Sequence, residues 1–227
     1  EAGIAFDFLS DEVGQGPGGE RILTGHDNGL ITLNVAEADS AERERMRLAM
    51  GENYRTLIGH FRHEIGHYYW DRLIRDQPAR LEAYRALFGD ETADYATALS
   101  NHYENGAPPD WQDRFISSYA SSHPWEDWAE TWAHFLHIDD TLEMAEAYSV
   151  PLGRIDGGVD HGPKSGSAEY DRFVSRWLVL SGLTNSLNRC MGLPDLYPFV
   201  INDAVAAKMR FVGQLLEEER ASERHAA

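Results

Sequence analysis

The sequence has very little cysteine, few basic residues and no long apolar run. Cys190 is the only cysteine among 227 residues, which excludes an internal disulfide and a zinc site built from cysteines. A metal would therefore have to bind histidine and carboxylate side chains. Lys and Arg number 20 against 38 Asp and Glu, a formal net charge of −18. This charge argues against nucleic acid or an anionic membrane surface as a partner.

No apolar stretch is long enough to cross a membrane, and no signal peptide is visible. We therefore expect a cytoplasmic protein, although the sequence begins at Glu1 rather than at a methionine. A chain of this length can bury one substantial core, and neither a linker nor an internal repeat divides it. We expect a single domain over residues 1–227.

The pattern of apolar residues changes near residue 37. Before it, residues 4–9, 21–24 and 29–35 predict strands, with a Gly-rich turn at 14–19 and a hairpin turn at Asp27-Asn28-Gly29. After it, helices are predicted over residues 40–49, 53–75, 79–88, 91–105, 123–137, 141–148, 168–187 and 199–219, with a loop at 150–167 and a turn-rich stretch at 185–198. The sequence thus predicts an α+β fold, with a small β-sheet in 1–36 and a helical region in 37–227.

The helix predicted over 53–75 carries the motif His63-Glu64-x-x-His67. Residues four apart on a helix are separated by about 400° of rotation, so both histidines project from one face and can hold a single Zn²⁺. Glu64 would lie beside the metal, where it suits a general base acting on zinc-bound water. The weaker interpretation is two hydrogen-bonded core histidines and a salt-bridged glutamate. Gly59 and Gly66 lower helix propensity and predict close approach of another element.

A zinc enzyme needs a third protein ligand and an open position for water. The helix predicted over 123–137 offers Glu126 and Glu130, which lie one turn apart on one side. Glu126 is our choice as third ligand, with Glu130 as the acceptor that orients a ligand imidazole. Spacing alone leaves the reverse assignment open. It also leaves open that both carboxylates only cap the helix or face solvent.

Together the two stretches resemble the gluzincins, zinc peptidases in which a glutamate on a later helix joins the His-Glu-x-x-His pair. Several gluzincins carry that ligand as Glu-x-x-Ala-Glu, and the run from Glu126 through Ala129 to Glu130 matches this form. The resemblance therefore implies Glu126 as the ligand. Gluzincins of the anthrax lethal factor type place an oxyanion-stabilising tyrosine seven residues earlier, the position of Tyr119. A core or surface role for Tyr119 stays open, and the other candidate donors are Tyr68, Tyr69 and Tyr103.

Residues 59–71, 123–134 and 185–199 resemble more closely the bacterial family called "putative zinc-binding metallopeptidase", and this resemblance covers nearly the whole chain. It implies a zincin-like metallopeptidase domain. Full-length members usually carry an N-terminal cysteine-rich zinc ribbon, which this sequence lacks, so any role of that module in targeting or substrate capture is left in doubt. The resemblance does not define a substrate.

These observations lead to the hypothesis of zinc-dependent peptide-bond hydrolysis. One Zn²⁺ would be held by His63, His67 and Glu126, and it would act on a peptide or protein substrate with Glu64 as general base and Tyr119 as oxyanion donor. A non-catalytic zinc-containing binding or regulatory module is one alternative, and a fourth protein ligand would favour it. A metal-dependent amidohydrolase of small substrates is the other, and a closed pocket would favour that.

Three further histidines in the two stretches need to be weighed as ligands. His60 lies on nearly the same helical face as His67, two turns earlier, which suits a place near the metal or the substrate. His123 and His134 flank the acidic helix and are more often structural. His134 is the best substitute as a ligand if Glu126 fails.

Overall fold

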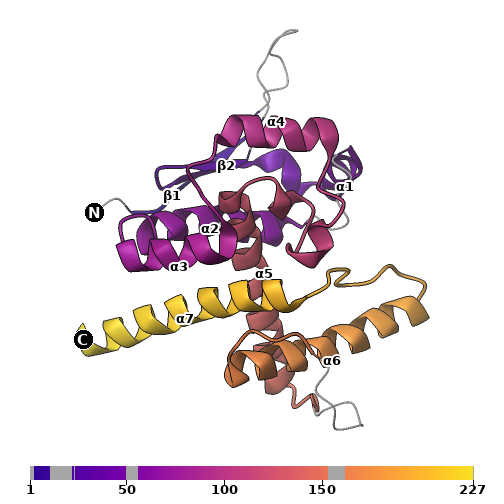
Figure 1. The fold of residues 1–227 in the computed structure, drawn as a ribbon. Helices are drawn as coiled ribbons and strands as arrows, with labels where there is room; N and C mark the ends of the chain where they lie inside the picture. Colours follow the sequence, from indigo (N-terminus) through magenta and orange to yellow (C-terminus); the bar gives the residue numbers. More distant parts are fainter. Residues whose placement is uncertain (1–2, 11–21, 23, 50–55, 153–161, 227) are drawn as a thin grey trace.

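A computed structural model describes residues 3–10, 22, 24–49, 56–152 and 162–226. The strands are β1 (Ala5–Leu9), β2 (Gly25–Asp27) and β3 (Leu30–Asn34). The α-helices are α1 (Ser40–Ala49), α2 (Leu57–Leu73), α3 (Pro78–Phe88), α4 (Tyr95–Asn105), α5 (Pro124–Ala147), α6 (Ala168–Cys190) and α7 (Asp203–Ala226), and the 3₁₀ helices are η1 (Val35–Ala38), η2 (Trp111–Asp113) and η3 (Tyr119–Ser121). The prediction of a mostly helical α+β fold with a small N-terminal sheet is confirmed (Figure 1).

The sheet has the strand order β1-β3-β2, with β1 parallel and β2 antiparallel to β3. Asn28 and Gly29 both have positive φ, 47° and 91°, as a two-residue turn that matches the twist of a hairpin requires. The predicted hairpin is confirmed, but its first strand is Gly25–Asp27 instead of 21–24, because so short a turn pairs the residues directly beside it. The Gly-rich turn expected at 14–19 lies outside the described residues.

Helices α2 and α5 pack closely against each other, and their packing brings the candidate site residues of the two helices together. A Cβ added to Gly66 would lie 3.1 Å from the Cα of Ala129 and 3.2 Å from the Cβ of Trp132. The indole of Trp128 also crosses the interface, since its Nε1 donates to the Gly66 carbonyl oxygen at 2.8 Å. The close approach expected at Gly66 is therefore observed, and α5 is the element that makes it.

Helix α5 passes through the middle of the molecule, with the sheet, α2 and α4 towards one end and α6 towards the other (Figure 1). His123 caps its N-terminus, since its Nδ1 accepts from the Trp125 backbone N–H at 3.1 Å. The prediction of separate helices at 123–137 and 141–148 was wrong, because α5 is continuous through Asp139 and Asp140. These acids are poor helix formers but no proline or glycine breaks the chain there.

Other helix boundaries also differ from the prediction. Helix α4 begins at Tyr95 and not at 91, because Asp94 caps it by accepting from the Thr97 N–H. Helix α6 begins as predicted but continues to Cys190, so the first part of the stretch predicted to be turn-rich is helical. Helix α7 spans Asp203–Ala226 in place of 199–219. The loop predicted at 150–167 lies partly outside the described residues.

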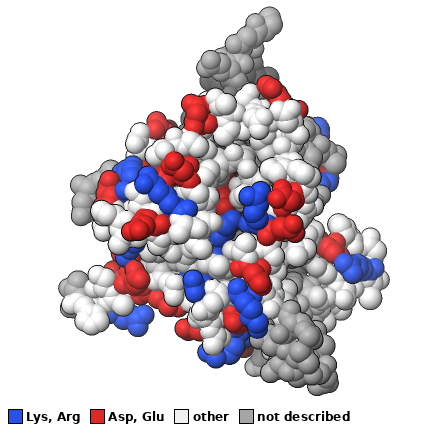
Figure 2. Space-filling model, in the orientation of Figure 1, with Lys and Arg blue, Asp and Glu red and all other residues white. Residues whose placement is uncertain are grey.

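The core lies where α5 meets α2, α3, α6 and α7. Its largest fully buried side chains include Trp128, Trp132, Tyr84, Ile74 and Ile138. Within the described part of the chain, no helix combines the length and the apolar character needed to cross a membrane. Acidic and basic side chains are interspersed on the face shown in Figure 2, so the negative net charge is not gathered there in one patch.

Candidate active site

Helix α2 presents both motif histidines to α5. Its N-cap is Thr56, whose hydroxyl accepts from the Gly59 N–H at 3.0 Å. His63 and His67 lie one turn apart and are both buried. Because burying imidazoles is costly unless they find polar partners, the side chains opposite them decide what this face can do.

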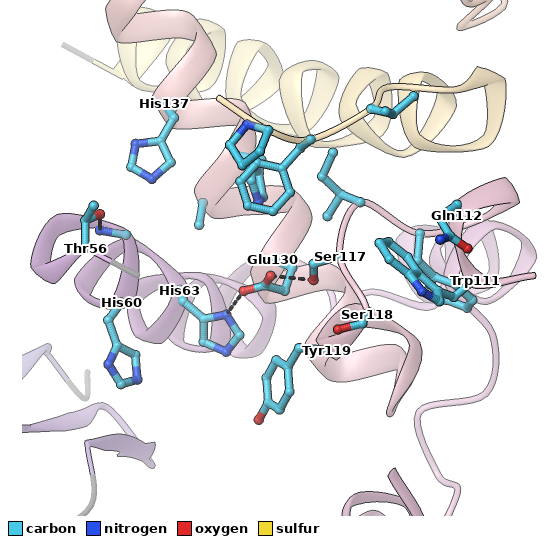
Figure 3. A pocket seen from close by; sticks show the side chains of 18 of the residues that line it. Thr56, His60, His63, Trp111, Gln112, Ser117, Ser118, Tyr119, Glu130 and His137 are labelled. Atoms are coloured by element: carbon cyan, nitrogen blue, oxygen red, sulfur yellow. Dashed lines mark hydrogen bonds and ion pairs between the residues drawn. The ribbon is translucent and has the colours of Figure 1, made fainter. Parts of the chain in front are cut away.

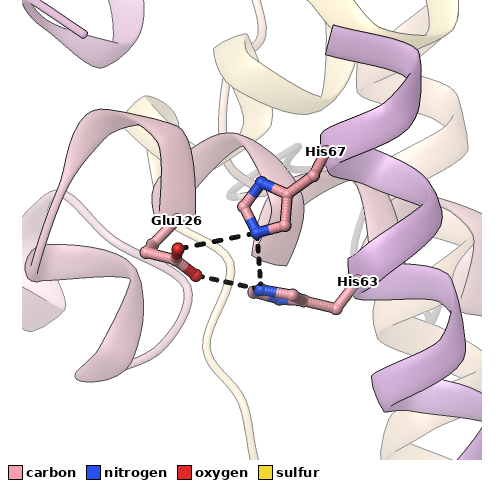
Figure 4. Close-up of side chains that lie close together, drawn as sticks. All are labelled: His63, His67 and Glu126. Carbon is pink, nitrogen blue, oxygen red and sulfur yellow. Dashed lines mark hydrogen bonds and ion pairs between the residues drawn. The ribbon is translucent and has the colours of Figure 1, made fainter. Parts of the chain in front are cut away.

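Glu126 is the partner that α5 supplies. The ligand atoms of His63, His67 and Glu126 all lie within 4.8 Å of one another, as Figure 4 shows. Glu126 Oε2 lies 2.9 Å from His63 Nε2, and Glu126 Oε1 lies 3.5 Å from His67 Nε2. The two Nε2 atoms are 3.2 Å apart. Sequence reasoning selected these three residues, and the structure brings them together.

The carboxylate of this cluster is ionised. Glu126 is 1 % exposed, and burial alone would raise its pKa. The imidazoles of His67 and His63 outweigh burial and hold the pKa of Glu126 well below its usual range. Two imidazole nitrogens and one ionised carboxylate are the donor set of many catalytic zinc sites. The Nδ1 of His67 is buried and has no hydrogen-bond partner among the described residues, while its Nε2 faces His63 and Glu126. The residues present therefore fit a divalent metal ion.

Glu130 lies behind the cluster. Its Oε1 lies 2.8 Å from His63 Nδ1, and its Oε2 accepts from the Ser117 hydroxyl at 2.6 Å (Figure 3). Burial opposes the charge of Glu130, but the hydrogen bond with His63 outweighs it and lowers the pKa of Glu130 to about 2. An ionised acceptor at Nδ1 directs the lone pair of His63 Nε2 towards the cluster, which is the orienting role predicted for Glu130.

Sequence analysis did not predict the hydrogen bond between Tyr95 and Glu126. The Tyr95 hydroxyl donates to Glu126 Oε1 at 2.6 Å from the first turn of α4. Burial raises the pKa of Tyr95, and the charge of Glu126 raises it further, so the hydroxyl stays protonated. Tyr95 lies 31 residues before Glu126, and no spacing signal in the sequence connects the two.

Glu64 is buried at the edge of the cluster. Its Oε1 lies 3.3 Å from His60 Nε2, one turn earlier on α2. Burial would raise the pKa of Glu64, but the hydrogen bond to His60 and the charges of His63 and His67 lower it overall. An ionised carboxylate beside a metal cluster can accept a proton from water, the role predicted for this residue.

Tyr119 lies in η3, with its ring centroid 6.0 Å from that of His63. Burial raises the pKa of Tyr119 well above its usual range, and the charge of Glu126 adds to this effect, so its hydroxyl is available as a donor. Among the alternative tyrosines, Tyr103 is mostly exposed. Tyr69 stacks on Trp132 with centroids 4.9 Å apart.

A cavity of about 420 Å³ opens beside these groups. His63, Tyr119 and Glu130 line one part of it, as Figure 3 shows. Glu64 lines the same cavity. The rest of its wall is mixed: polar side chains alternate with apolar and aromatic ones, which include Trp111, Phe115, Ile116, Phe199 and Val200. A buried carboxylate, a tyrosine and space for a ligand therefore lie next to one another.

The other histidines in the described part of the chain lie outside this three-residue cluster. His134 Nδ1 lies 2.9 Å from the Tyr197 hydroxyl, and burial lowers the pKa of His134 to about 4, so this imidazole is a neutral buried group. His123 caps α5 and lies 3.1 Å through its Nε2 from the Ala93 carbonyl oxygen. Among the described residues, His63, His67 and Glu126 form the one cluster that could hold a metal ion.

The comparisons with known proteins agree with this geometry. An uncharacterized protein of Mycobacterium bovis is 48 % identical over 216 residues, which cover 95 % of this chain and 61 % of the relative. An uncharacterized protein of Mycobacterium tuberculosis matches with the same identity and coverage. The chain thus spans about 61 % of the length of these curated relatives. No solved structure shows a significant match. A family model described as "Putative zinc-binding metallo-peptidase" matches residues 1–215, and the chain, with its buried cluster of two histidines and a glutamate, belongs to that family.

Proposed function

We propose that this chain hydrolyses peptide bonds in a peptide or protein substrate, using one zinc ion held by His63, His67 and Glu126. The observation that carries the proposal is the placement of Glu64 and Tyr119 on one cavity with His63, directly beside a cluster that fits a metal. Zinc bound there supplies a Lewis acid that acidifies water and polarises a carbonyl group.

Glu64 performs the proton transfers in this mechanism. Its carboxylate is kept ionised by His60, His63 and His67. It accepts the proton of the attacking water and delivers it to the leaving amine. Tyr119 donates its hydroxyl proton in a hydrogen bond to the oxyanion that develops on the carbonyl, a contact typically worth about 3–4 kcal/mol of the barrier. Glu130 and Tyr95 hold His63 and Glu126 in position.

The cavity beside the three-residue cluster supports a peptidase over the two alternatives. A non-catalytic zinc module would be expected to close the metal with a fourth protein ligand, and the described residues offer three. A cavity of about 420 Å³ walled by aromatic side chains suits the side chain of a peptide next to the cleaved bond.

The test is a Glu64→Gln variant. It keeps the size and shape of the side chain but removes the base, so hydrolysis should fall about 10²–10⁴-fold while zinc content stays at one ion per chain. Cleavage of a peptide library is followed by mass spectrometry, and zinc is measured by elemental analysis. Glu143→Gln, a matched change at an exposed position on α5, should leave both readouts unchanged. Full activity of Glu64→Gln on a proven substrate would overturn the mechanism.

A further inference from the structure

A line of four side chains leads from the N-terminal sheet to Glu64. His60 Nε2 lies 3.3 Å from Glu64 Oε1, and His60 Nδ1 lies 2.7 Å from Glu37 Oε2. The other oxygen of Glu37 accepts from the Thr24 hydroxyl at 2.8 Å. An imidazole is therefore held between two carboxylates, one of which is the proposed general base.

Both carboxylates in this line are buried. Glu37 is 4 % exposed and Glu64 is 5 % exposed, so each depends on its partners to remain ionised. An ionised carboxylate only accepts hydrogen bonds, and the bond to each therefore needs an N–H on the facing nitrogen of His60. His60 lines the cavity beside Glu64, which places this arrangement at the reaction site and not at a remote surface.

The backbone around Glu37 is fixed from two sides. Asn34 caps η1 by accepting from the Ala36 N–H at 2.9 Å, and its own backbone N–H donates to the Thr24 hydroxyl at 3.0 Å. Arg43 of α1 donates to the Glu37 carbonyl oxygen at 2.7 Å. Glu37 is thus a preorganised anchor, held by the sheet on one side and by α1 on the other.

We propose that His60 and Glu37 are positioning residues for Glu64, an inference that rests on the proposed function. Glu37 fixes the His60 ring, and the ring holds one carboxylate oxygen of Glu64 through its Nε2–H. The second oxygen of Glu64 is then left to accept the proton of water. In this arrangement the N-terminal sheet sets the geometry of a general base that lies on α2.

Two substitutions at His60 separate positioning from a purely structural role. In His60→Asn the amide can occupy the place of Nδ1, which keeps a partner for Glu37 but loses the contact with Glu64. In His60→Gln the amide can occupy the place of Nε2 and still donate to Glu64 while the anchor at Glu37 is lost. We expect kcat to fall about 10–100-fold in His60→Asn, with KM little changed, and to be partly restored in His60→Gln.

Two further variants test the anchor. Glu37→Gln, which removes the charge, should lower kcat less than His60→Asn does. Thr24→Val, which removes only the hydroxyl, should have the smallest effect, and Thr24→Ser should restore wild-type kcat. Glu44→Gln is the matched control, since Glu44 forms a surface ion pair with Arg47 on α1 outside this line. Zinc content and thermal unfolding are measured for every variant, and the substrate is a fluorogenic peptide that the wild type cleaves.

A second readout does not depend on turnover. In the ¹⁵N-labelled zinc-loaded protein, the His60 Nε2–H should give a downfield, slowly exchanging proton resonance in NMR spectra. The resonance should move upfield in Glu64→Gln, where a neutral amide replaces the carboxylate. If the wild type cleaves no peptide, the proposed function fails, but this resonance still reports the contact between His60 and Glu64.

Three results would overturn the positioning role. The first is wild-type kcat in a folded, zinc-loaded His60→Asn variant. The second is a higher kcat in His60→Asn than in His60→Gln, which would show that the contact between His60 and Glu64 does not govern kcat. The third is a His60 Nε2–H resonance that is absent from the wild type or unchanged in Glu64→Gln.

Discussion

Glu126 and Asp127 are consecutive acids in the first turn of α5, and both are almost fully buried. Their side chains contact different kinds of partner. Glu126 points to two imidazoles of α2, while Asp127 Oδ2 accepts from the Lys208 ammonium of α7 at 2.6 Å. Lys208 also donates to the Arg114 carbonyl oxygen at 2.7 Å and lies 4.4 Å from the centroid of the Phe115 ring. One carboxylate lies against two imidazoles, and the other is enclosed with a cation.

The pKa values of the two acids move in opposite directions for this reason. The histidines outweigh burial at Glu126 and lower its pKa, whereas burial dominates at Asp127 and raises its pKa to about 7 despite the nearby Lys208. The difference teaches that burial alone does not identify a metal ligand. What distinguishes Glu126 is that its neighbours are imidazoles, side chains of a type that binds metals, while the neighbour of Asp127 is a cation.

The largest effect, on the free energy of unfolding, is expected from breaking the ion pair between Asp127 and Lys208. Lys208→Met leaves Asp127 buried without its cation, which should lower the free energy of unfolding by about 3–5 kcal/mol at pH 8 and leave zinc binding unchanged. Urea unfolding at several pH values measures this cost. Lys164→Met, at an exposed lysine, is the matched control and should change stability little.

The pH dependence of this variant follows from the raised pKa of Asp127. Its folded-state pKa of about 7 lies above the ordinary aspartate value of 3.8, so the ionisation of this group makes stability fall as pH rises from about 4 to about 7. Without Lys208 the folded-state pKa rises further, and the fall continues above pH 7. The cost of Lys208→Met should therefore be smaller at pH 5 than at pH 8. An equal cost at both would contradict the assignment of a buried ion pair.

Zinc affinity is the next quantity on which the two acids should differ. Glu126→Gln removes the charged ligand and should weaken zinc binding more than about 100-fold, since even partners outside the ligand set contribute about 10–100-fold. Asp127→Asn, the same chemical change one residue later, should leave zinc affinity unchanged in the folded protein. Competition with a zinc chelator measures both. An equal loss of zinc affinity in the two variants would contradict the assignment of Glu126, and not Asp127, as the zinc ligand.

The hydrogen bond from Tyr95 to Glu126 should also affect zinc affinity, because it holds the carboxylate of Glu126 in place. Tyr95→Phe removes the hydroxyl that donates to Glu126 Oε1 and should weaken zinc binding about 10–100-fold, about 1.4–2.7 kcal/mol. Tyr148→Phe, at a mostly exposed position just after α5, is the control. Zinc affinity of Tyr95→Phe equal to that of the wild type would mean that the hydroxyl does not orient the ligand.

The local parts of this site were predictable from sequence. The spacing of His63 and His67 on one helix needs only the pitch of the helix. The choice of Glu126 depended on the resemblance carried by the run from Glu126 to Glu130. The structure supplies a physical setting for that run, because the small Ala129 lies against Gly66 where α2 and α5 approach most closely.

The contacts that hold the site were not predictable, because they join segments far apart in the chain. Tyr95 reaches Glu126 from a helix 31 residues earlier, and Glu37 reaches His60 from a 3₁₀ helix 23 residues earlier. No periodicity or turn signal encodes such pairings, which depend on how the elements pack. The continuity of α5 was also missed, since its acidic residues 139 and 140 lower helix propensity where tertiary packing of the surrounding helix maintains it.

The most direct measurement of the central claim is a crystal structure of the zinc-loaded protein with anomalous data collected on both sides of the zinc edge. The account predicts one anomalous peak, about 2.0–2.2 Å from His63 Nε2, His67 Nε2 and a Glu126 oxygen, with a position left open towards the cavity. A peak at any other place, or a zinc ion enclosed by four protein ligands, would contradict it.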